Sequence, residues 1–393
     1  MAVNLTNADS ALKSYYLEAV SEQLDNYSNP FLSQIKKTTD NVWGKDVKQL
    51  AIYGVNGGVG AGTEDGSLPK AGGNNYMQFT STLKNLYGTV EISDKAIRAS
   101  ENNSGALVSL LNSEMDGLVK SSSFNLSRML FGDGTGYLAR VSELVEDNVF
   151  EMDNVSLLME GMIIDFYSPS ETPISGASGR RILYVDRDEN TVKVDGATFD
   201  ENDVPEDSFM VLHGSYEKEL TGLGAIFDTA SDTLYGIDKT TNPWIKPKVK
   251  LNVGNITEAA IQKMLDRLEE ESGSAANMII TSFGVRRALI NLFSTNRRVV
   301  NTIELERGFK ALSYNGIPIV ADRFCPYGTM YILNTKDFAL HQLCDWQWLT
   351  GEDGRVLQQV PGKPVYTATL VKYAELMCSR PYAQGALKGI NEA

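Results

Sequence analysis

The chain has few of the residues from which catalytic and metal sites are most often built. It contains only two histidines, His213 and His341, in 393 residues, which leaves little scope for imidazole acid–base chemistry or for histidine-based metal sites. Its three cysteines, Cys325, Cys344 and Cys378, show no Cys-x-x-Cys spacing and are predicted to be reduced thiols from a cytosolic folding environment. We therefore assign no catalytic, cofactor-binding or metal-ligating residue.

Long apolar runs and a surplus of positive charge are also missing. No stretch approaches the ~20 apolar residues of a membrane span, and the opening "MAVNLTNADS" lacks the basic and apolar segments of a signal peptide. We therefore expect neither a membrane span nor a signal peptide. The 36 basic and 50 acidic residues give a net charge of −14, which argues against tight nucleic-acid binding through phosphate neutralisation. With 42% hydrophobic residues, the chain can form two or three domains.

Glycine is concentrated in one stretch, residues 51–79, which holds eight of them. Gly57 and Gly62 have the spacing of P-loop glycines, but Thr63 stands where the phosphate-binding lysine is required. The dinucleotide pattern that begins at Gly58 also fails at Thr63. Because the stretch that follows has strand rather than helix character, we interpret these glycines as a flexible hairpin tip. A nucleotide-binding enzyme is the weaker alternative.

The N-terminal third of the sequence alternates between helical and extended patterns. Apolar residues at helical spacing predict an amphipathic helix over 6–27, and "SNPFLSQIKKTTD", residues 28–40, predicts an extended arm. Residues 76–93 are rich in strand formers and predict the second strand of a hairpin. A long apolar stripe predicts a helix over 104–131, which "GDGTG", residues 132–136, ends.

Residues 144–227 lose the helical periodicity and become acidic. Several strand candidates separated by turn residues predict a small β-barrel or β-sandwich inserted into the main path of the chain. Within it, "DRDEN", residues 186–190, superficially resembles a calcium loop, but Thr191 and Ala197 replace the glycine and glutamate that such a loop requires. A tight hairpin turn is the favoured interpretation.

The last third of the sequence shows an α/β pattern. Asn315 and Gly316 form the strongest short hairpin signal of the chain, and Gly273 is suited to follow a helix. The predicted helices are 257–272 and 283–293, and the predicted strands are 277–282, 309–314, 317–322, 329–335 and 365–381.

The order of these elements, together with "SYNGIPIVADRFCPYGTMYILNTKDFAL" at residues 313–340, resembles the major capsid proteins of tailed bacteriophages, which have the Hong Kong 97 fold. The resemblance implies an α+β fold with an inserted, β-barrel-like domain. The implied parts are an N-terminal arm (1–50), an extended hairpin loop (51–93), a spine helix with peripheral domain (94–143), the inserted β domain (144–227), a connector with peripheral domain (228–252), an axial α/β domain (253–355) and a returning C-terminal strand (356–393).

The resemblance also implies a function. Such a chain is a structural protein, not an enzyme, that self-assembles through hexamers and pentamers into an icosahedral head shell enclosing DNA without sequence-specific binding. Implied partners are scaffolding, portal and decoration proteins, and the implied location is the virion after assembly in the host cytoplasm. No charged helical scaffold segment precedes residue 1, so we expect a separate scaffolding protein, a substitute role for the inserted domain, or a processed N-terminus. An encapsulin-like nanocompartment shell is the alternative function.

Overall fold

The computed structural model describes residues 29–95, 104–200, 203–295, 302–304, 310–352 and 354–392. The helix expected over 6–27 lies outside these described residues. The chain divides into two compact units, which are Ser121–Ala225 and the combination of Met1–Lys120 with Ile226–Ala393. Each unit has its own core and is described by itself.

The first described element is a short helix rather than the extended arm predicted over 28–40. The side chain of Asn29 accepts hydrogen bonds from the backbone N–H groups of Phe31 and Leu32, at 2.9 and 3.1 Å, and Pro30 occupies the first helical position. Capping and a fixed proline φ both favour a helix start. The prediction of extended chain is therefore wrong over α3 (Pro30–Gln34) and holds only from β1 (Lys36–Thr38) onward.

A five-stranded sheet built on two long strands forms one part of the larger unit. Its strands are β1, β20 (Phe338–Trp348), β22 (Val365–Cys378), β21 (Gln358–Gln359) and β5 (Lys84–Ser93). β22 pairs antiparallel with β20 along one edge and with β5 along the other, so it is the central strand. The prediction of a long final strand is confirmed.

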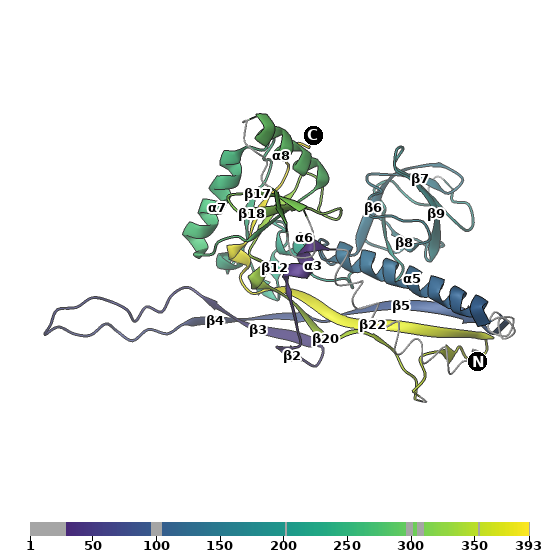
Figure 1. Ribbon diagram of the computed structural model, residues 1–393, viewed down its shortest axis with the longest axis horizontal. Helices are drawn as coiled ribbons and strands as arrows, with labels where there is room; N and C mark the ends of the chain where they lie inside the picture. Colours follow the sequence, from purple (N-terminus) through teal and green to yellow (C-terminus); the bar gives the residue numbers. More distant parts are fainter. Residues whose placement is uncertain are drawn as a thin grey trace. The chain divides into compact units, whose positions relative to one another are not determined.

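A hairpin of β3 (Asp46–Tyr53) and β4 (Asn75–Thr82) flanks the glycine-rich stretch, and β2 (Val42–Trp43) pairs with its base. The single strand predicted over 76–93 is wrong, because the chain breaks at Leu83. There the backbone N–H of Leu83 donates to the carbonyl of Lys45, and β5 leaves the hairpin to pair with β22. Figure 1 shows the glycine-rich loop continuing beyond the ends of β3 and β4.

The α/β part of the larger unit is a seven-stranded mixed sheet with two amphipathic helices. The side chain of Thr257 caps α7 through the N–H of Ala260, and Gly273 ends this helix with φ of 62°. The hairpin predicted at Asn315 and Gly316 is confirmed. In spatial order the strands are β14 (Lys248–Lys250), β23 (Gly385–Leu387), β19 (Met330–Leu333), β15 (Met278–Thr281), β18 (Ile317–Ala321), β17 (Lys310–Tyr314) and β16 (Thr302–Glu304); the helices are α7 (Glu258–Ser272) and α8 (Phe283–Thr295).

Buried apolar side chains from α7, α8 and the strands form the core of this part. Two 3₁₀ turns connect it to the long sheet, η3 (Thr335–Asp337) between β19 and β20 and η4 (Pro381–Ala383) between β22 and β23. The short elements that precede β14 along the chain are α6 (Leu223–Ile226), β12 (Thr233–Leu234), β13 (Ile237–Asp238) and the 3₁₀ turn η2 (Pro243–Ile245).

Asp322, at the end of β18, is a buried acid whose environment predicts a pH dependence of stability. Burial raises its pKa from 3.8 to about 6, so between about pH 4 and 6 the folded state binds a proton that the unfolded state has lost. Its contribution to the free energy of unfolding therefore falls as the pH rises through this window. Asp322→Asn keeps an oxygen for the N–H of Phe324, which the carboxylate accepts at 2.9 Å, and should stabilise the fold at pH 7 by about 2–3 kcal/mol.

Urea unfolding at pH 4.5 and pH 7 measures this effect. Asp65→Asn, at an exposed carboxylate, is the matched control and should change neither value. Equal stability of the Asp322→Asn variant and the parent chain at both pH values would contradict the prediction.

The smaller unit contains a closed six-stranded antiparallel barrel, which confirms the predicted inserted β-barrel (Figure 1). Around the barrel the strands are β10 (Thr191–Val194), β7 (Val149–Met152), β6 (Tyr137–Glu146), β11 (Phe209–Leu212), β8 (Ile163–Tyr167) and β9 (Arg180–Asp186). Its core includes Phe150, Phe166 and Phe199, which contact one another. Alternate residues along the strands supply this interior, as expected for a small barrel.

The turn between β9 and β10 is the tight hairpin turn predicted at 186–190. The carboxylate of Asp186 accepts hydrogen bonds from the N–H groups of Asp188 and Glu189, and Asn190 takes the left-handed conformation with φ of 52°. An aspartate that bonds its own backbone two residues on is a typical turn device.

The barrel begins earlier than the sequence predicted. Its strand β6 starts at Tyr137, before the expected domain start at residue 144, directly after α5 (Ser104–Met129). The register of β6 against β7 shifts between Val141 and Glu143 and again between Leu144 and Glu146. These irregularities interrupt the alternation of apolar and polar residues that marks a strand in a sequence. The helix predicted over 104–131 is confirmed as α5.

Candidate assembly surfaces

The base of the β3–β4 hairpin is anchored on one face by aromatic residues from later in the chain. Phe79 is fully buried, and its ring lies 5.7 Å from Tyr235 and 6.2 Å from Trp244 between centroids. Trp244 also stacks on Tyr53 at 4.4 Å with nearly parallel planes. The N–H of Thr80 donates to the carbonyl of Tyr235 at 3.0 Å. This face of the hairpin is therefore held by its own chain.

The opposite face of the hairpin carries apolar side chains that nothing in the described chain covers. Leu50, Ile52 and Tyr76 are 61%, 55% and 54% exposed. Ile52 lies directly opposite Tyr76 in the register, and Leu50 is on the same face because side chains alternate along a strand. We call these three residues the hairpin patch. An exposed apolar group of this kind is typical of a surface that contacts another protein.

The loop between the strands, residues 54–74, extends the same exposed character. Val55, Val59 and Leu68 are each more than four-fifths exposed, and no residue of the loop is buried. At its base the two chain segments approach so closely that a Cβ on Gly58 would lie 2.7 Å from the nitrogen of Gly72. Glycine is required at this approach because it has no side chain. A strand, β4, follows this loop, whereas a phosphate-binding loop precedes a helix.

Removal of the anchoring tryptophan should loosen the hairpin alone. In Trp244→Ala the stacking contact with Tyr53 is lost, which costs about 0.5–1.5 kcal/mol in addition to the lost burial. Backbone amides of β3 and β4 should then exchange hydrogen faster, while those of β20 and β22 should keep their rates. Trp43→Ala, at an exposed position of β2, is the control. Uniform acceleration in all four strands would contradict local anchoring.

The long sheet offers a second surface along β5. Among the described strands β5 pairs with β22 and lies at the edge of the sheet, a position from which a strand can pair with another chain. Its buried side chains, such as Leu86 and Val90, face the sheet core, whereas Tyr87 on the other face is 60% exposed.

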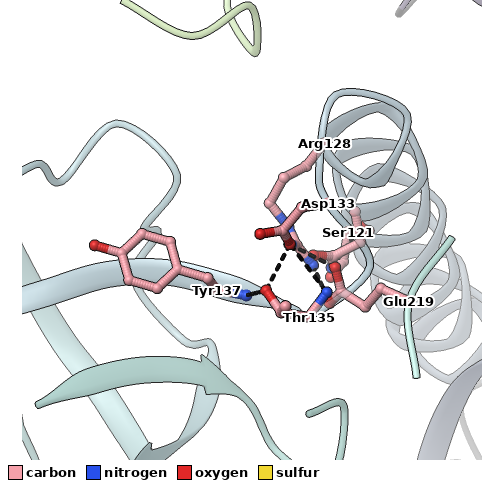
Figure 2. A network of polar contacts seen from close by, with 7 residues as sticks. Ser121, Arg128, Asp133, Thr135, Tyr137 and Glu219 are labelled. Atoms are coloured by element: carbon pink, nitrogen blue, oxygen red, sulfur yellow. Dashed lines mark hydrogen bonds and ion pairs between the residues drawn. The ribbon is translucent and has the colours of Figure 1, made fainter. Parts of the chain in front are cut away.

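A buried ion pair holds the two ends of the smaller unit together (Figure 2). Two guanidinium nitrogens of Arg128, at the end of α5, donate to the two carboxylate oxygens of Glu219 at 2.8 and 2.5 Å. Both side chains are 3% exposed. Beside this pair the Asp133 carboxylate accepts from the N–H and hydroxyl of Thr135 at 3.0 and 2.5 Å. These bonds position the chain where it enters and leaves the barrel.

A second buried charge lies in the long sheet. The fully buried Lys372 of β22 donates to Asp345 at 2.5 Å and to Gln342 at 2.8 Å. Burial alone would raise the pKa of Asp345, but the positive charges of Lys372 and Lys37 hold it below its usual value. This ion pair links β20 to β22 in the region where the pairing register of the two strands shifts.

The two histidines lie in separate places. His213 contacts Asp165 at 2.8 Å through Nδ1, and Ser178 also bonds this carboxylate. Burial would raise the pKa of Asp165, but the hydrogen bonds from His213 and three other donors hold it low. His341 is buried in β20 and contacts the carbonyl of Asp40.

The sequence reasoning missed the buried charges at Arg128, Asp165, Glu219 and Lys372. Two of them, Asp165 in "IIDFY" and Lys372 in "LVKYAEL", could have been predicted, because each is a charged residue within an otherwise apolar strand.

Three further findings concern metals, membranes and the cysteines. Within the described ranges, no group of three or more histidine, cysteine, aspartate or glutamate side chains is placed to hold a metal ion. None of the helices in the described part of the chain has the length and apolar character of a membrane span. The three cysteines are free thiols, and burial raises the pKa of Cys325 and Cys378.

Comparison with solved structures identifies the architecture as the Hong Kong 97 capsid fold, and this chain contains a closed six-stranded barrel. The chain is similar to a chain of the cyanophage A-1(L) capsid asymmetric unit, with 13% identity, a TM-score of 0.55, and coverage of 94% of this chain and 93% of that one. The likeness therefore extends over nearly the whole chain and shows the fold.

Two other solved structures are similar with TM-scores of 0.48, and the fold assignment does not depend on them. One is the capsid of an empty GTA particle, at 12% identity and coverage of 92% and 90% of the two chains. The other is the holo-SrpI encapsulin complex from Synechococcus elongatus PCC 7942, at 10% identity and coverage of 95% of both chains. No protein-family model matches the sequence, and no curated protein matches it.

Proposed function

We propose that this chain is a phage major capsid protein that self-assembles into an icosahedral head shell around DNA. The observation that carries the proposal is the hairpin patch with its glycine-rich loop, because an apolar extension that the described part of its own chain leaves uncovered suits contact with a neighbouring subunit. The whole-chain likeness to a cyanophage capsid chain supports the same conclusion. Covering the patch on a second copy would bury the remaining exposed area of its three side chains, each contributing roughly half of the about 1.5–3 kcal/mol that full burial is worth.

The contact is proposed to be heterologous, with the hairpin of one copy lying on a different surface of the next. Such contacts close into rings when the rotation between copies permits it, as in hexamers and pentamers. Scaffolding, portal and decoration proteins are the proposed further partners, and the virion, assembled in the host cytoplasm, is the proposed location. The proposed role is structural, without catalysis.

Negative-stain microscopy of the purified chain, expressed with and without its genomic neighbours, tests this function. We expect uniform closed shells, and we expect the double substitution Leu50→Ser with Ile52→Ser to prevent them while the subunit stays folded. Lys48→Ser, an exposed polar position on the same face, is the control. A chain that stays monomeric under all assembly conditions would contradict the proposal.

The contents of the shell separate the phage head from the nanocompartment alternative. A head recovered from infected cells protects DNA from nuclease, whereas an encapsulin-like shell contains protein cargo. Nuclease-resistant DNA in the particles is the expected result, and shells filled with a co-purifying enzyme would favour the alternative.

A further inference from the structure

Nearly all of the net negative charge of the chain lies in the barrel unit. Ser121–Ala225 contains 20 acidic and seven basic residues, a net charge of −13 out of −14 for the whole chain. The rest of the chain is close to neutral. A unit with this charge repels nucleic acid and other copies of itself, and it attracts cationic partners over a distance of about a Debye length.

The outer face of the barrel also carries a cluster of aromatic rings that its interior does not use. Tyr167 of β8 lies opposite Phe209 of β11, and their ring centroids are 5.6 Å apart. The neighbouring residues Phe166 and Met210 belong to the interior core, so alternation directs Tyr167 and Phe209 outward. Tyr216 stacks on Tyr167 at 4.5 Å.

We call Tyr167, Phe209 and Tyr216 the aromatic platform. Phe209 is buried and the two tyrosines are half-buried, so the accessible part of the platform is that of the tyrosines. The cation–π pairs of the described residues involve other rings. Aromatic clusters with exposed faces are typical of binding surfaces, because they offer large rigid contact areas.

Acidic groups surround this platform. The carboxylates of Glu171 and Glu217 are both close enough to the Tyr216 hydroxyl to act on it electrostatically. Burial, followed by these carboxylates, raises the pKa of Tyr216 to about 12, which reports negative charge close to its ring. Burial, and after it the negative charge of Asp165, raise the pKa of Tyr167 as well.

The basic groups close to the platform already have partners. Lys218 donates to the carbonyl of Gly214, and His213 bonds Asp165. Arg140, which lies beside Tyr137, forms an ion pair with Asp207 at 3.2 Å. The part of the platform formed by Tyr167 and Tyr216 therefore combines aromatic rings with the carboxylates of Glu171 and Glu217. Neither carboxylate has a lysine or arginine partner among the ion pairs of the described residues.

We propose that this part of the aromatic platform binds a cationic segment of a partner protein. An arginine or lysine of that segment would lie over a tyrosine ring, and its charge would be balanced by Glu171 and Glu217. Charge complementarity selects this occupant, because a nucleic acid or the barrel of a second copy would bring further negative charge to the surface. The inference concerns the barrel alone and does not depend on shell assembly.

Fluorescence anisotropy with a fluorescein-labelled peptide of four arginines separated by glycines, titrated with the full-length chain at about 0.15 M salt, tests the proposal. We expect saturable binding. Tyr216→Leu keeps apolar volume but removes the π face, and it should weaken binding about threefold. Tyr184→Leu, at an exposed barrel tyrosine outside the platform, should leave the dissociation constant unchanged.

The contribution of charge is tested in the same assay. Glu171→Gln should weaken peptide binding, whereas the control Glu146→Gln, at an exposed barrel glutamate outside the platform, should not. If the two tyrosine variants, or the two glutamate variants, changed the dissociation constant equally, the peptide would be bound by the general negative charge of the protein. That result would overturn the proposal. Absence of peptide binding would overturn it as well. So would binding of duplex DNA or a neutral oligosaccharide that depends on Tyr216. Shell formation, observed separately by microscopy, affects none of these outcomes.

Discussion

Deletion of residues 59–71 is expected to abolish shell formation while leaving a folded, soluble subunit. The deletion would join Gly58 to Gly72, whose backbones already meet at the base of the loop, so the strands β3 and β4 need not move. No residue of the removed segment is buried, and its loss should cost the isolated subunit little stability. The exposed side chains of Val59 and Leu68, by contrast, would be lost from every intersubunit contact of a shell.

Circular dichroism and thermal melting of the subunit, with microscopy of assembly reactions, measure both parts of this prediction. Val59→Ser with Leu68→Ser keeps the length of the loop and should weaken assembly through lost apolar burial. Thr63→Ser, in the same loop, should assemble normally. Normal shells from the deletion variant would show that the loop has no role in assembly.

Arg128→Ala is expected to destabilise the barrel unit by about 3–5 kcal/mol, because it leaves the buried carboxylate of Glu219 without its counter-charge. The double variant Arg128→Met with Glu219→Leu removes both charges together. It should cost much less, since no unpaired ion remains buried.

Urea unfolding of the variants measures these differences. Arg140→Ala is the matched control, because Arg140 and Asp207 form an exposed pair, 51% and 62% accessible, whose loss should cost less than about 1 kcal/mol. An Arg128→Ala variant as stable as Arg140→Ala would mean that the buried pair does not hold the entry and exit of the barrel together.

Elements with local signals at both ends were predictable from the sequence. Thr257 and Gly273 bound α7 as a cap and a left-handed terminus, and Asn315 with Gly316 turns β17 into β18. In each case the residues that decide the structure lie within a few positions of it, and their conformational preferences do not depend on distant contacts.

Elements whose limits depend on distant partners were not predictable. The break at Leu83 exists because β5 finds a partner in β22, far along the chain. The start of the barrel at Tyr137 was hidden by two register shifts. The pairing of Arg128 with Glu219 joins residues on either side of the whole barrel, and no spacing rule connects them.

For most of the long elements the sequence by itself determined the kind and the order, and with them the resemblance to a capsid fold, because periodicity and turn chemistry are local properties of the chain. Only the tertiary structure decided which face of the hairpin is free. Leu50, Ile52 and Tyr53 are all apolar, and alternation assigns them to two faces without saying which is covered. Trp244, contributed from a distant segment, stacks on Tyr53 and leaves Leu50 and Ile52 exposed, so the free face depends on a contact that no local pattern encodes.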